Sequence, residues 1–421
     1  MASDLLPIGL VGCGGMGVRH LRAYAALRRA GVERFAVEAV CDPRPGAAAA
    51  AADLAELLLG ARPQTFDDHE QLIASGAVVA LDIVTDPAVH HLVAIPALEF
   101  GLHVICEKPL GITVRACRAM VDAAARGGRL LATAENYRRD GPNRLARAVL
   151  EAGLLGEIHL MLELNLGGDD AVLVSPWRHI HEAGSIALDM GVHYTDIFRY
   201  YLGDLASVSG SAFIAEPFRI LDPGAPLATG IEEVSPGVMR ATGADSLVAL
   251  FETCAGVPIQ LSYVPSGPGR RFVQRSVHGR LGSMSVPPDR SGGALVVELG
   301  ERRLSGAELR RELGGFELEG VAAELFGRAG TEYDLPFPAV DAATIGIELA
   351  DFGAAVARRG VPEVDGLAGL QAVAAVWAVA ESSASGGSVR IAEVVDGTLS
   401  RAQDALDRKL GLLPGLSGVR T

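Results

Sequence analysis

The stretch Ile8-Gly9-Leu10-Val11-Gly12-Cys13-Gly14-Gly15-Met16-Gly17 joins a short apolar run to a glycine-rich turn. An alanine- and leucine-rich segment with helical character follows at 18–29. In such a unit the first glycine permits a tight turn, the second lets backbone approach a pyrophosphate, and the third lets helix and strand pack closely. The helix start adds free N–H groups that favour phosphate. The stretch therefore predicts a dinucleotide site along Gly12, Gly14, Gly15, Met16 and Gly17.

The surroundings of this turn matter because 51 glycines make a chance match common. A second strand, expected at 35–41, ends in Asp42, about 20 residues beyond the glycines. A carboxylate there can accept both ribose hydroxyls of NAD and would repel the 2′-phosphate of NADP. Arg44 stands two residues later and could pair with that phosphate. The pattern favours NAD and leaves NADP open; the plainer alternative is that Asp42 is a turn residue before Pro43.

The first 135 residues alternate between strand and helix patterns. After the first two strands we expect three more at 78–85, 102–105 and 129–133, with helices at 46–60, 88–100 and 113–125. This alternation predicts an α/β Rossmann domain with a doubly wound parallel sheet. Thr85-Asp86-Pro87 and Glu107-Lys108-Pro109 both follow strands, so both should face the crevice at the carboxyl ends of the strands.

Beyond residue 135 the pattern changes to short strands joined by Gly/Pro-rich turns. It predicts an α+β domain whose open, mostly antiparallel sheet is flanked by helices. Its strands are expected at 157–166, 205–214, 246–253, 257–264, 271–278, 281–286 and 294–299, and its later helices at 342–358, 367–383 and 395–410. Residues 215–245 are read as a long connection. The predicted division is 1–135, a Rossmann domain; 136–400, a substrate-binding domain; and 401–421, a tail.

Lysine use singles out Lys108. The chain holds only two lysines, Lys108 and Lys409, among many arginines. Arg is always charged, whereas the Lys ammonium is a compact donor whose pKa moves readily on burial. A retained amine directly after a predicted strand therefore indicates a catalytic or binding role. The alternative is chance codon usage, because Lys409 shows that a lysine can also persist without such a position.

The segment Asp189-Met190-Gly191-Val192-His193 lies in a helical stretch expected from 184 to 201. Asp189 and His193 are four residues apart and share one helix face. A carboxylate beside an imidazole orients the ring, and such a histidine can take a proton from a hydroxyl. The competing interpretation is a structural His–Asp pair.

Composition excludes several classes of partner. A net charge of −14 without a basic run argues against nucleic acid and anionic membranes. The five cysteines, at 13, 41, 106, 117 and 254, show no C-x-x-C spacing, so we expect neither disulfides nor a zinc ribbon and place the chain in a reducing cytoplasm. We find no signal-like N-terminus and no apolar run long enough to span a membrane.

Several motifs together resemble the Gfo/Idh/MocA oxidoreductases, the glucose–fructose oxidoreductase and inositol dehydrogenase family, over residues 6 to 400. The matching elements are the glycine turn at 12–17, Thr85-Asp86-Pro87-Ala88-Val89-His90, Glu107-Lys108-Pro109, Asn136-Tyr137-Arg138-Arg139, Trp177-Arg178 and Asp189-x-Gly191-x-His193-x-x-Asp196. Asp86 departs from the small or apolar residue that the family often has there. The 215–245 connection and the C-terminal extension are also longer than usual.

This resemblance implies a role for each matched residue. Lys108, Asp189 and His193 would form the catalytic set, with His193 as general acid/base, Lys108 bonded to the reacting oxygen and Asp189 tuning His193. Asp196 is left as a packing or capping residue. The residues along the dinucleotide would be Thr85, Pro87, His90, Glu107, Lys108 and Asn136.

Substrate contacts are expected from Arg138, Arg139, Trp177, Arg178 and His193. Each arginine could instead be solvated or structural. Trp177 could stack on a sugar ring or pack at the rim of the site. His179 and His181 stand near His193 in the sequence, but no carboxylate or cysteine set completes a metal site, so no metal is expected.

The predicted activity is reversible oxidation of a secondary hydroxyl of a sugar, sugar derivative or cyclitol by NAD(P). Two alternatives stay open: a redox-assisted glycoside hydrolase or lyase on the same fold, and a non-catalytic dinucleotide-binding sensor. An open sheet leaves one face to cover, so a homodimer or homotetramer is expected.

Overall fold

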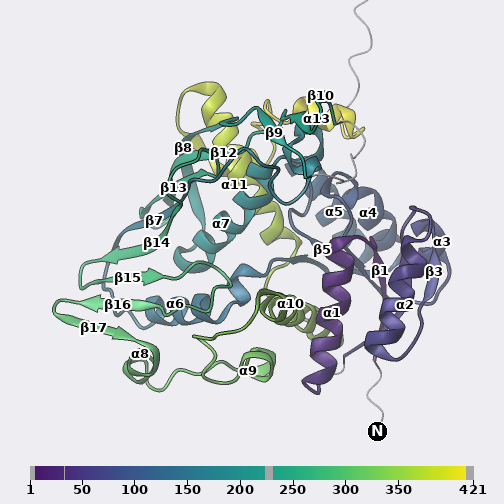
Figure 1. Ribbon diagram of the computed structural model, residues 1–421, viewed down its shortest axis with the longest axis horizontal. Coiled ribbons are helices and arrows are strands. Elements are labelled where there is room, and N and C mark those ends of the chain that lie inside the picture. Colours follow the sequence, from purple (N-terminus) through teal and green to yellow (C-terminus); the bar gives the residue numbers. More distant parts are fainter. Residues whose placement is uncertain (1–4, 33, 223–230, 414–421) are drawn as a thin grey trace, which may run out of the picture. The chain divides into compact units, whose positions relative to one another are not determined.

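The computed structural model describes residues 5–32, 34–222 and 231–413 (Figure 1). The chain forms two compact units, each assembled from separate stretches. Unit 1 comprises 1–110, 119–154 and 286–369, and unit 2 comprises 111–118, 155–285 and 370–421. The predicted domain boundaries at 135 and 400 stay a prediction.

A six-stranded parallel sheet, in the order β3-β2-β1-β4-β5-β6, is the centre of unit 1. Its strands are β1 (Leu6–Val11), β2 (Phe35–Cys41), β3 (Gln64–Phe66), β4 (Ala80–Ile83), β5 (His103–Glu107) and β6 (Leu131–Ala134). The strand order reverses between β1 and β4, which is where such a sheet places a ligand crevice at its carboxyl edge. The predicted doubly wound sheet is confirmed.

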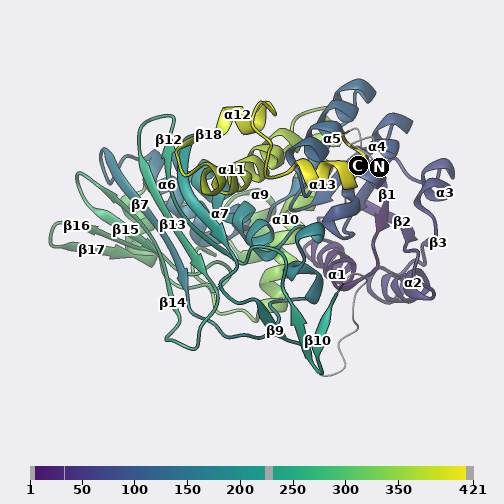
Figure 2. The same ribbon diagram turned by 90° about the horizontal axis from the view of Figure 1, so that it is seen from above.

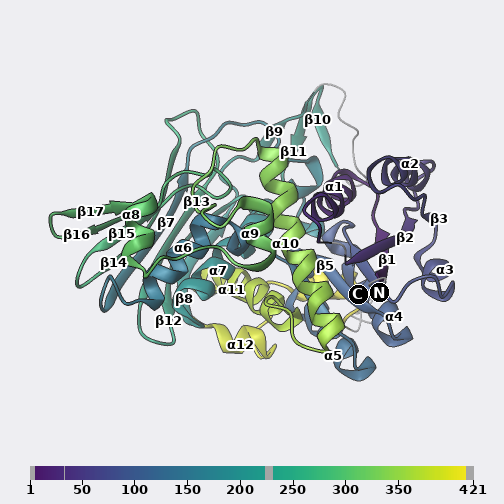
Figure 3. The same ribbon diagram turned by 90° about the horizontal axis from the view of Figure 1, so that it is seen from below.

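Helices connect and cover these strands. They are α1 (Gly15–Arg29), α2 (Ala47–Leu59), α3 (His69–Ala74), α4 (His90–Phe100), α5 (Val114–Gly127) and, much later in the chain, α10 (Phe337–Arg358). Figure 3 shows α10 alongside α1, and the two helices pack together. Leu21 of α1 and Phe352 of α10 are fully buried in the same core as Ile8 and Leu10 of β1. A helix more than 300 residues away thus completes the wall behind the glycine turn.

The remaining elements of unit 1 surround this core, and Val321 and Leu325 of the last of them pack against it. They are α6 (Gly141–Glu151), the hairpin β16 (Val296–Leu299) and β17 (Arg302–Ser305), α8 (Gly306–Glu312) and α9 (Gly320–Phe326). Two short 3₁₀ turns, η1 (Pro87–Val89) and η2 (Tyr137–Arg139), follow β4 and β6. They begin at the strand ends where the sequence places candidate site residues.

Unit 2 contains the strand order β15-β14-β7-β13-β12-β8-β18. The bounds are β7 (Ile158–Leu166), β8 (Leu205–Phe213), β12 (Ser246–Thr253), β13 (Pro258–Val264), β14 (Phe272–Gly279), β15 (Ser283–Val286) and β18 (Val389–Arg390). The pairs of β12 with β8 and β13, of β14 with β7 and of β18 with β8 are antiparallel, and β13 pairs with β7 in parallel. The predicted mostly antiparallel sheet is confirmed.

The two faces of this sheet differ. Figure 2 shows α7 (Ile186–Leu202) and α11 (Gly366–Ser385) together on one face. Alternate residues of β12 are buried beneath them, whereas Val248 and Leu250 on the same strand are exposed. Strand alternation therefore puts one apolar row in the core and leaves a second row in solvent.

The described parts of 215–245 contain strands that were not predicted. They include β9 (Phe218–Ile220), β10 (Glu233–Ser235) and β11 (Val238–Arg240), which form a small sheet in the order β10-β11-β9. The fully buried pair of Arg219 with Asp245, 2.6 Å between Nη2 and Oδ2, ties this sheet to the chain beyond it. The prediction of a plain connection was wrong for these segments, and 223–230 lie outside the described residues.

The helix predicted at 395–410 was also wrong. The structure has α12 (Ile391–Val395) and α13 (Asp404–Lys409) instead. Between them, Gly397 has a φ of 82° and Asp396 accepts a hydrogen bond from the backbone of Thr398, 2.9 Å away. A left-handed glycine ends a helix, so the apolar period on either side belongs to two elements. Of the predicted tail, 414–421 lie outside the described residues.

One described helix, α11, has the length and apolar composition of a membrane span. Of its most apolar window, 67% is buried inside the structure. This burial is what the core helix of a folded domain shows.

The glycine turn supplies a test of the fold. A Cβ added to Gly17 would lie 2.3 Å from the carbonyl oxygen of Gly12, whereas one added to Gly15 would meet nothing within 4 Å. We expect Gly17→Ala to lower the free energy of unfolding by about 2 kcal/mol or more, because backbone must move. The matched Gly15→Ala should stay within about 1 kcal/mol of wild type. Urea unfolding of the cofactor-free protein measures both, and equal losses would contradict the packing argument.

Candidate functional site

The glycine turn between β1 and α1 has the shape of a phosphate cradle. Gly12 has a φ of 105°, and a Cβ there would lie 2.8 Å from the backbone of Val84. A Cβ on Gly14 would meet only the guanidinium of Arg44, 3.5 Å away, so the surface above the turn is open. The turn therefore presents bare backbone at the start of α1, as an approaching pyrophosphate requires.

Asp42 lies beside this turn at the end of β2 and is buried. Its Oδ2 accepts the backbone N–H of Cys13 at 2.8 Å. Arg44 donates its backbone N–H and Nε to Oδ1, both at 2.9 Å, and Nη2 to Oδ2 at 2.7 Å. Burial acts to raise the pKa of Asp42, but the hydrogen bonds from Arg44 and Cys13 outweigh it and lower the pKa. Arg44 is itself 64% exposed, so its side chain is free to swing away from Asp42.

His90 joins the two strand-end turns. Its Nε2 lies 3.0 Å from the carbonyl oxygen of Thr85, and its Nδ1 lies 3.1 Å from that of Pro109. The ring is fully buried, and burial lowers its pKa. His90 therefore holds the turn after β4 against the turn after β5. Pro87 is buried at the start of η1, and Thr85 is half-buried beside it.

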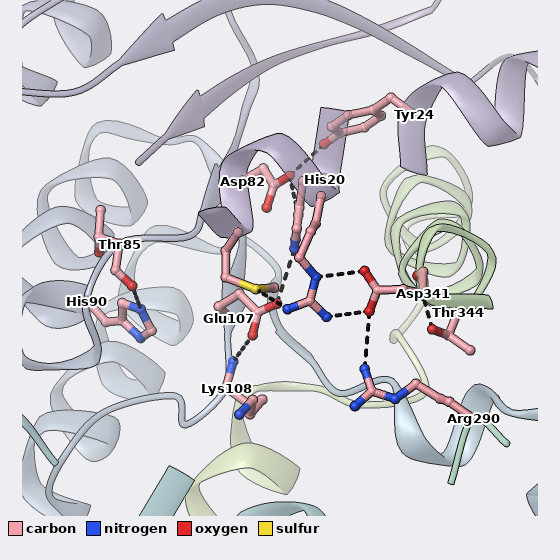
Figure 4. Close-up of polar contacts among 12 residues, drawn as sticks. His20, Tyr24, Asp82, Thr85, His90, Glu107, Lys108, Arg290, Asp341 and Thr344 are labelled. Atoms are coloured by element: carbon pink, nitrogen blue, oxygen red, sulfur yellow. Dashed lines mark hydrogen bonds and ion pairs between the residues drawn. The ribbon is translucent and has the colours of Figure 1, made fainter. Parts of the chain in front are cut away.

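Glu107 and its neighbours form a buried hydrogen-bonded chain (Figure 4). The backbone N–H of Lys108 donates to Oε2 of Glu107 at 2.9 Å, and Oε1 lies 3.1 Å from Nε2 of His20. Nδ1 of His20 lies 2.8 Å from Asp82, which also accepts from Tyr24 at 2.9 Å. This chain links α1 to β4 and β5 and fixes the backbone at Lys108, whose side chain is half-buried.

Burial and charge act in opposite directions on this chain. Burial acts to lower the pKa of His20, but Asp82 and Glu107 outweigh it and raise the pKa to about 10. Burial acts to raise the pKa of Glu107, yet contact with His20 lowers it. Both groups are therefore charged at neutral pH. A buried pair of this kind persists only when its remaining polar atoms are also satisfied.

A second set of charges lies beside Met16, whose sulfur accepts from Nη1 of Arg19 at 2.8 Å. Arg19 binds Asp341 of α10 through two nitrogens, one of them at 2.6 Å. Arg290 donates to the same carboxylate at 3.1 Å. Figure 4 shows the guanidinium group of Arg290 directed at Asp341. These pairs fasten α10 to the helix that follows the glycine turn.

The motif after β6 is more deeply buried than a substrate surface would be. Arg139 is 3% exposed and pairs with Glu363 and with Asp351, the latter at 3.0 Å. Arg138 lies 3.9 Å from Glu363, and Asn136 is buried. For Arg139 this geometry favours the structural alternative that the sequence leaves open. Burial raises the pKa of the neighbouring Glu135 to about 7.

In unit 2 the candidate catalytic pair lies on α7. Ser185 caps its start by accepting the N–H of Leu188, and both Asp189 and His193 are buried on it. Asp189 accepts Nε of Arg178 at 2.9 Å. The guanidinium of Arg178 also lies 4.2 Å from the ring centre of Trp177. Arg178 and Trp177 belong to η3 (Pro176–His179), so this short turn is anchored to the helix at Asp189.

His179 has a structural role. It is fully buried, and its Nε2 accepts the backbone N–H of Leu173 at 2.9 Å. Burial, followed by the charge of Arg219, lowers its pKa to about 4. His181, in η4 (His181–Ala183), contacts the edge of Trp377 instead. The two histidines thus serve separate packing contacts.

Comparison with known proteins agrees with this geometry. A family model described as an oxidoreductase family with an NAD-binding Rossmann fold matches residues 6–135. A second model, the GFO/IDH/MocA C-terminal domain, matches residues 143–285. The chain belongs to the Gfo/Idh/MocA family. It is therefore an NAD(P)-dependent oxidoreductase acting on CH–OH groups, and residues 6–135 form its NAD-binding domain.

Individual relatives of this Gfo/Idh/MocA protein act on sugars and cyclitols. Levoglucosan dehydrogenase from Pseudarthrobacter phenanthrenivorans is 30% identical over 288 residues, which cover 66% of this chain and 73% of the relative. Inositol 2-dehydrogenase 2 from Saccharopolyspora erythraea is 31% identical over 285 residues, covering 67% and 73%. A levoglucosan dehydrogenase structure with NADH and L-sorbose has the same fold, with a TM-score of 0.74 at 24% identity, covering 92% of this chain and 99% of that one.

Sequence reasoning missed several polar residues of the Gfo/Idh/MocA chain. His20, Asp82 and Asp341 belong to none of the motifs, yet they hold the glycine turn and the Lys108 turn in place. Their partners lie 51 to 322 residues away in the sequence. A lone histidine one turn into the helix after the glycines was the available signal for His20.

The pKa of His179 leads to a prediction about stability. The unfolded chain binds a proton here near pH 6.5 and the folded chain near pH 4, so the folded state loses stability as the pH falls through this window. The loss should approach roughly 3 kcal/mol at pH 4. His179→Gln, which keeps an acceptor for Leu173, should flatten the pH dependence of urea unfolding between pH 6.5 and 4. His159→Gln, at an exposed position, is the control and should retain the wild-type slope.

Proposed function

We propose that this protein is a dehydrogenase that oxidises a secondary hydroxyl of a sugar, a sugar derivative or an inositol-like cyclitol with NAD. The supporting observation is that similarity to sugar and inositol dehydrogenases occurs together with two sequence motifs that carry proton-transferring residue types. The chain is 30% identical to a levoglucosan dehydrogenase and 31% identical to an inositol dehydrogenase. It also keeps Glu107-Lys108-Pro109 after β5 and Asp189-x-Gly191-x-His193 on α7. Residues that carry proton chemistry are thus retained at ordered positions.

The proposed cofactor-binding residues fall into groups that serve the pyrophosphate, the adenosine ribose and the nicotinamide half of NAD. Backbone at Gly14, Gly15 and the start of α1 faces the pyrophosphate, with Met16 alongside. Asp42 binds the adenosine ribose when Arg44 releases it. Glu107 and His90 contribute by supporting the site, because both are buried and hold the turns that carry Lys108 and Thr85. Thr85, Pro87, Lys108 and Asn136 are assigned to the nicotinamide half.

Bound NAD would supply the acceptor for the hydride that leaves the substrate carbon. The chain's own residues handle the proton. The Lys108 ammonium donates a hydrogen bond to the substrate oxygen, and Nε2 or Nδ1 of neutral His193 removes the hydroxyl proton. Asp189 lies on the same helix face as His193 and is already paired with the positive charge of Arg178. Its effect on His193 is therefore mainly orientation.

Substrate recognition is assigned to Arg138, Trp177, Arg178 and His193. The Arg178 guanidinium covers the Trp177 ring, so the pair presents a planar surface with hydrogen-bond donors at its edge. Such a surface suits a polyhydroxylated ring. Arg139, a candidate because of its motif, is assigned to the ion pairs with Glu363 and Asp351.

The exposed apolar row of the unit 2 sheet supports assembly into a homodimer or homotetramer. Val248 and Leu250 on β12 are 42% and 53% exposed, and Phe272 on β14 of the same sheet is 47% exposed. An apolar sheet face of this kind is normally covered. We also propose a cytoplasmic location, in keeping with cysteines that are all unpaired. The proposed domain division is 1–135, 136–400 and a tail.

The two lysines provide a matched test of catalysis. Lys108→Met keeps the length of the side chain and removes its charge, so turnover should fall by about 10²-fold or more while NAD binding stays within about threefold. Lys409→Met changes a side chain that is 65% exposed and should leave both unchanged. His193→Ala should lose turnover as Lys108→Met does. NADH formation is followed across cyclitols, aldoses and methyl glycosides, with cofactor binding measured separately.

The same panel distinguishes the alternatives. NADH formation by wild type and the Lys409 variant alone supports the dehydrogenase. Release of sugar from a glycoside without net NADH would favour the redox-assisted hydrolase. Wild-type turnover in Lys108→Met would refute the catalytic assignment. Tight NAD binding with no conversion of any compound would favour the sensor.

Cofactor preference follows from the Asp42–Arg44 pair. Asp42→Ala should raise the KM for NAD by about 10-fold and shift preference towards NADP, because the ribose loses its acceptor and Arg44 is released. Arg44→Ala should keep NAD use and abolish any NADP use. Steady-state kinetics with both cofactors measure these effects. An unchanged KM for NAD in Asp42→Ala would contradict the assignment.

A further inference from the structure

Three buried side chains of unit 1 point metal-ligand atoms at one another. They are His20 in α1, Glu107 at the end of β5 and Glu348 in α10. Their exposed fractions are 0%, 5% and 2%. One ligand atom from each lies within 4.8 Å of the other two. Within the described part of the chain, no other group of histidine, cysteine and carboxylate side chains meets this distance.

Glu348 is the member that the site chemistry leaves unexplained. Both of its carboxylate oxygens are buried, and neither has a hydrogen-bond partner. Native proteins satisfy nearly all of their buried polar atoms, so an orphaned carboxyl group calls for a partner. The oxygens are too far from His20 and Glu107 for a direct hydrogen bond, yet close enough for one bridging atom to contact all three.

The other two ligands are prepared for a metal by their outer contacts. Nδ1 of His20 lies 2.8 Å from Asp82, which leaves Nε2 for the cluster. Oε2 of Glu107 accepts the Lys108 N–H at 2.9 Å, which leaves Oε1 for the cluster. A histidine whose second nitrogen is bonded to a carboxylate is the usual partner arrangement at protein zinc sites. The 3.1 Å between Nε2 and Oε1 is close to the separation of neighbouring ligands whose bonds to one ion are about 2.0–2.2 Å long.

We propose that His20 Nε2, Glu107 Oε1 and a carboxylate oxygen of Glu348 bind one divalent transition-metal ion. One imidazole and two carboxylates match Zn²⁺, with water completing the tetrahedron. The two charges of the ion offset the two carboxylates that bind it, while Asp82 keeps its contacts with Nδ1 of His20 and with Tyr24. The ion fastens α1, β5 and α10 together and holds the backbone of the Lys108 turn. Its role is structural, since all three ligands are buried.

Protons are the competing occupants. In the metal-free protein, the positive charge of His20 offsets Glu107, and a proton neutralises Glu348. Burial and the negative charge of Glu107 raise the pKa of Glu348, which favours that proton. Zn²⁺ must displace two protons, the one on Nε2 of His20 and the one on Glu348. The experiment therefore has to separate an ion from a proton at Glu348.

The full-length protein is stripped with a chelator, dialysed and titrated with Zn²⁺ by calorimetry, with Tm recorded in parallel. We expect one equivalent of Zn²⁺ per chain with a Kd below about 1 μM, and a rise in Tm. Glu348→Gln keeps the shape and should weaken binding by about 100-fold or more and abolish the rise in Tm. Glu301→Gln, at an exposed turn, is the matched control and should behave as wild type.

A second readout covers the case in which Glu348→Gln does not fold. Co²⁺ added to the stripped wild-type protein should give the visible absorption of a tetrahedral site, and His20→Gln should lose it. Equal Zn²⁺ binding by wild type and Glu348→Gln, or a wild-type protein that binds no stoichiometric Zn²⁺ and shows no Co²⁺ spectrum, would overturn the proposal and leave a proton on Glu348. Neither readout uses substrate, so the result is independent of the proposed dehydrogenase activity.

Discussion

The approach of Gly17 to the carbonyl oxygen of Gly12 sets the direction in which α1 leaves the sheet. A Cβ on Gly17 would lie 2.3 Å from that oxygen, so the helix can start this close to β1 only with glycine there. The consequence reaches beyond the phosphate cradle. Because α1 starts so close to β1, His20 contacts Asp82 and Glu107 at the ends of two strands. The glycine spacing thus positions the cofactor turn and the backbone of Lys108 together.

Charge compensation then decides which residue types this interior accepts. Asp82 and Glu107 are buried, and each needs donors because an unpaired buried carboxylate is costly. A protonated His20 supplies two donors on different sides of a charged ring, so it reaches both carboxylates at once. An amide at position 20 would keep the shape but leave one carboxylate short of positive charge. Lys108 differs, since it joins this network through its backbone N–H, which donates to Glu107.

Local pattern predicted most strands but few of the polar partnerships. The alternation of apolar and polar residues in β12 and β13 predicted the ends of both strands to within one residue, because each strand buries one face. The three-residue strands β9 to β11 were missed, since their order depends on the buried Arg219–Asp245 pair rather than on periodicity. The helix expected at 395–410 failed because Gly397 interrupts a continuous apolar period. Motifs singled out Lys108 and Asp189, but polar partners 51 to 322 residues apart leave no local signal.

The contact between Asp189 and Arg178 changes how the α7 pair is understood. A lone carboxylate raises the basicity of a nearby imidazole, because it stabilises the protonated ring. Asp189 already carries a hydrogen bond from Arg178 at 2.9 Å, so part of its charge is compensated. The carboxylate on the helix face of His193 is therefore also the anchor of the turn that carries Arg178. The same arginine contacts Trp177, so the turn that presents the ring and the carboxylate that orients the helix are joined by one side chain.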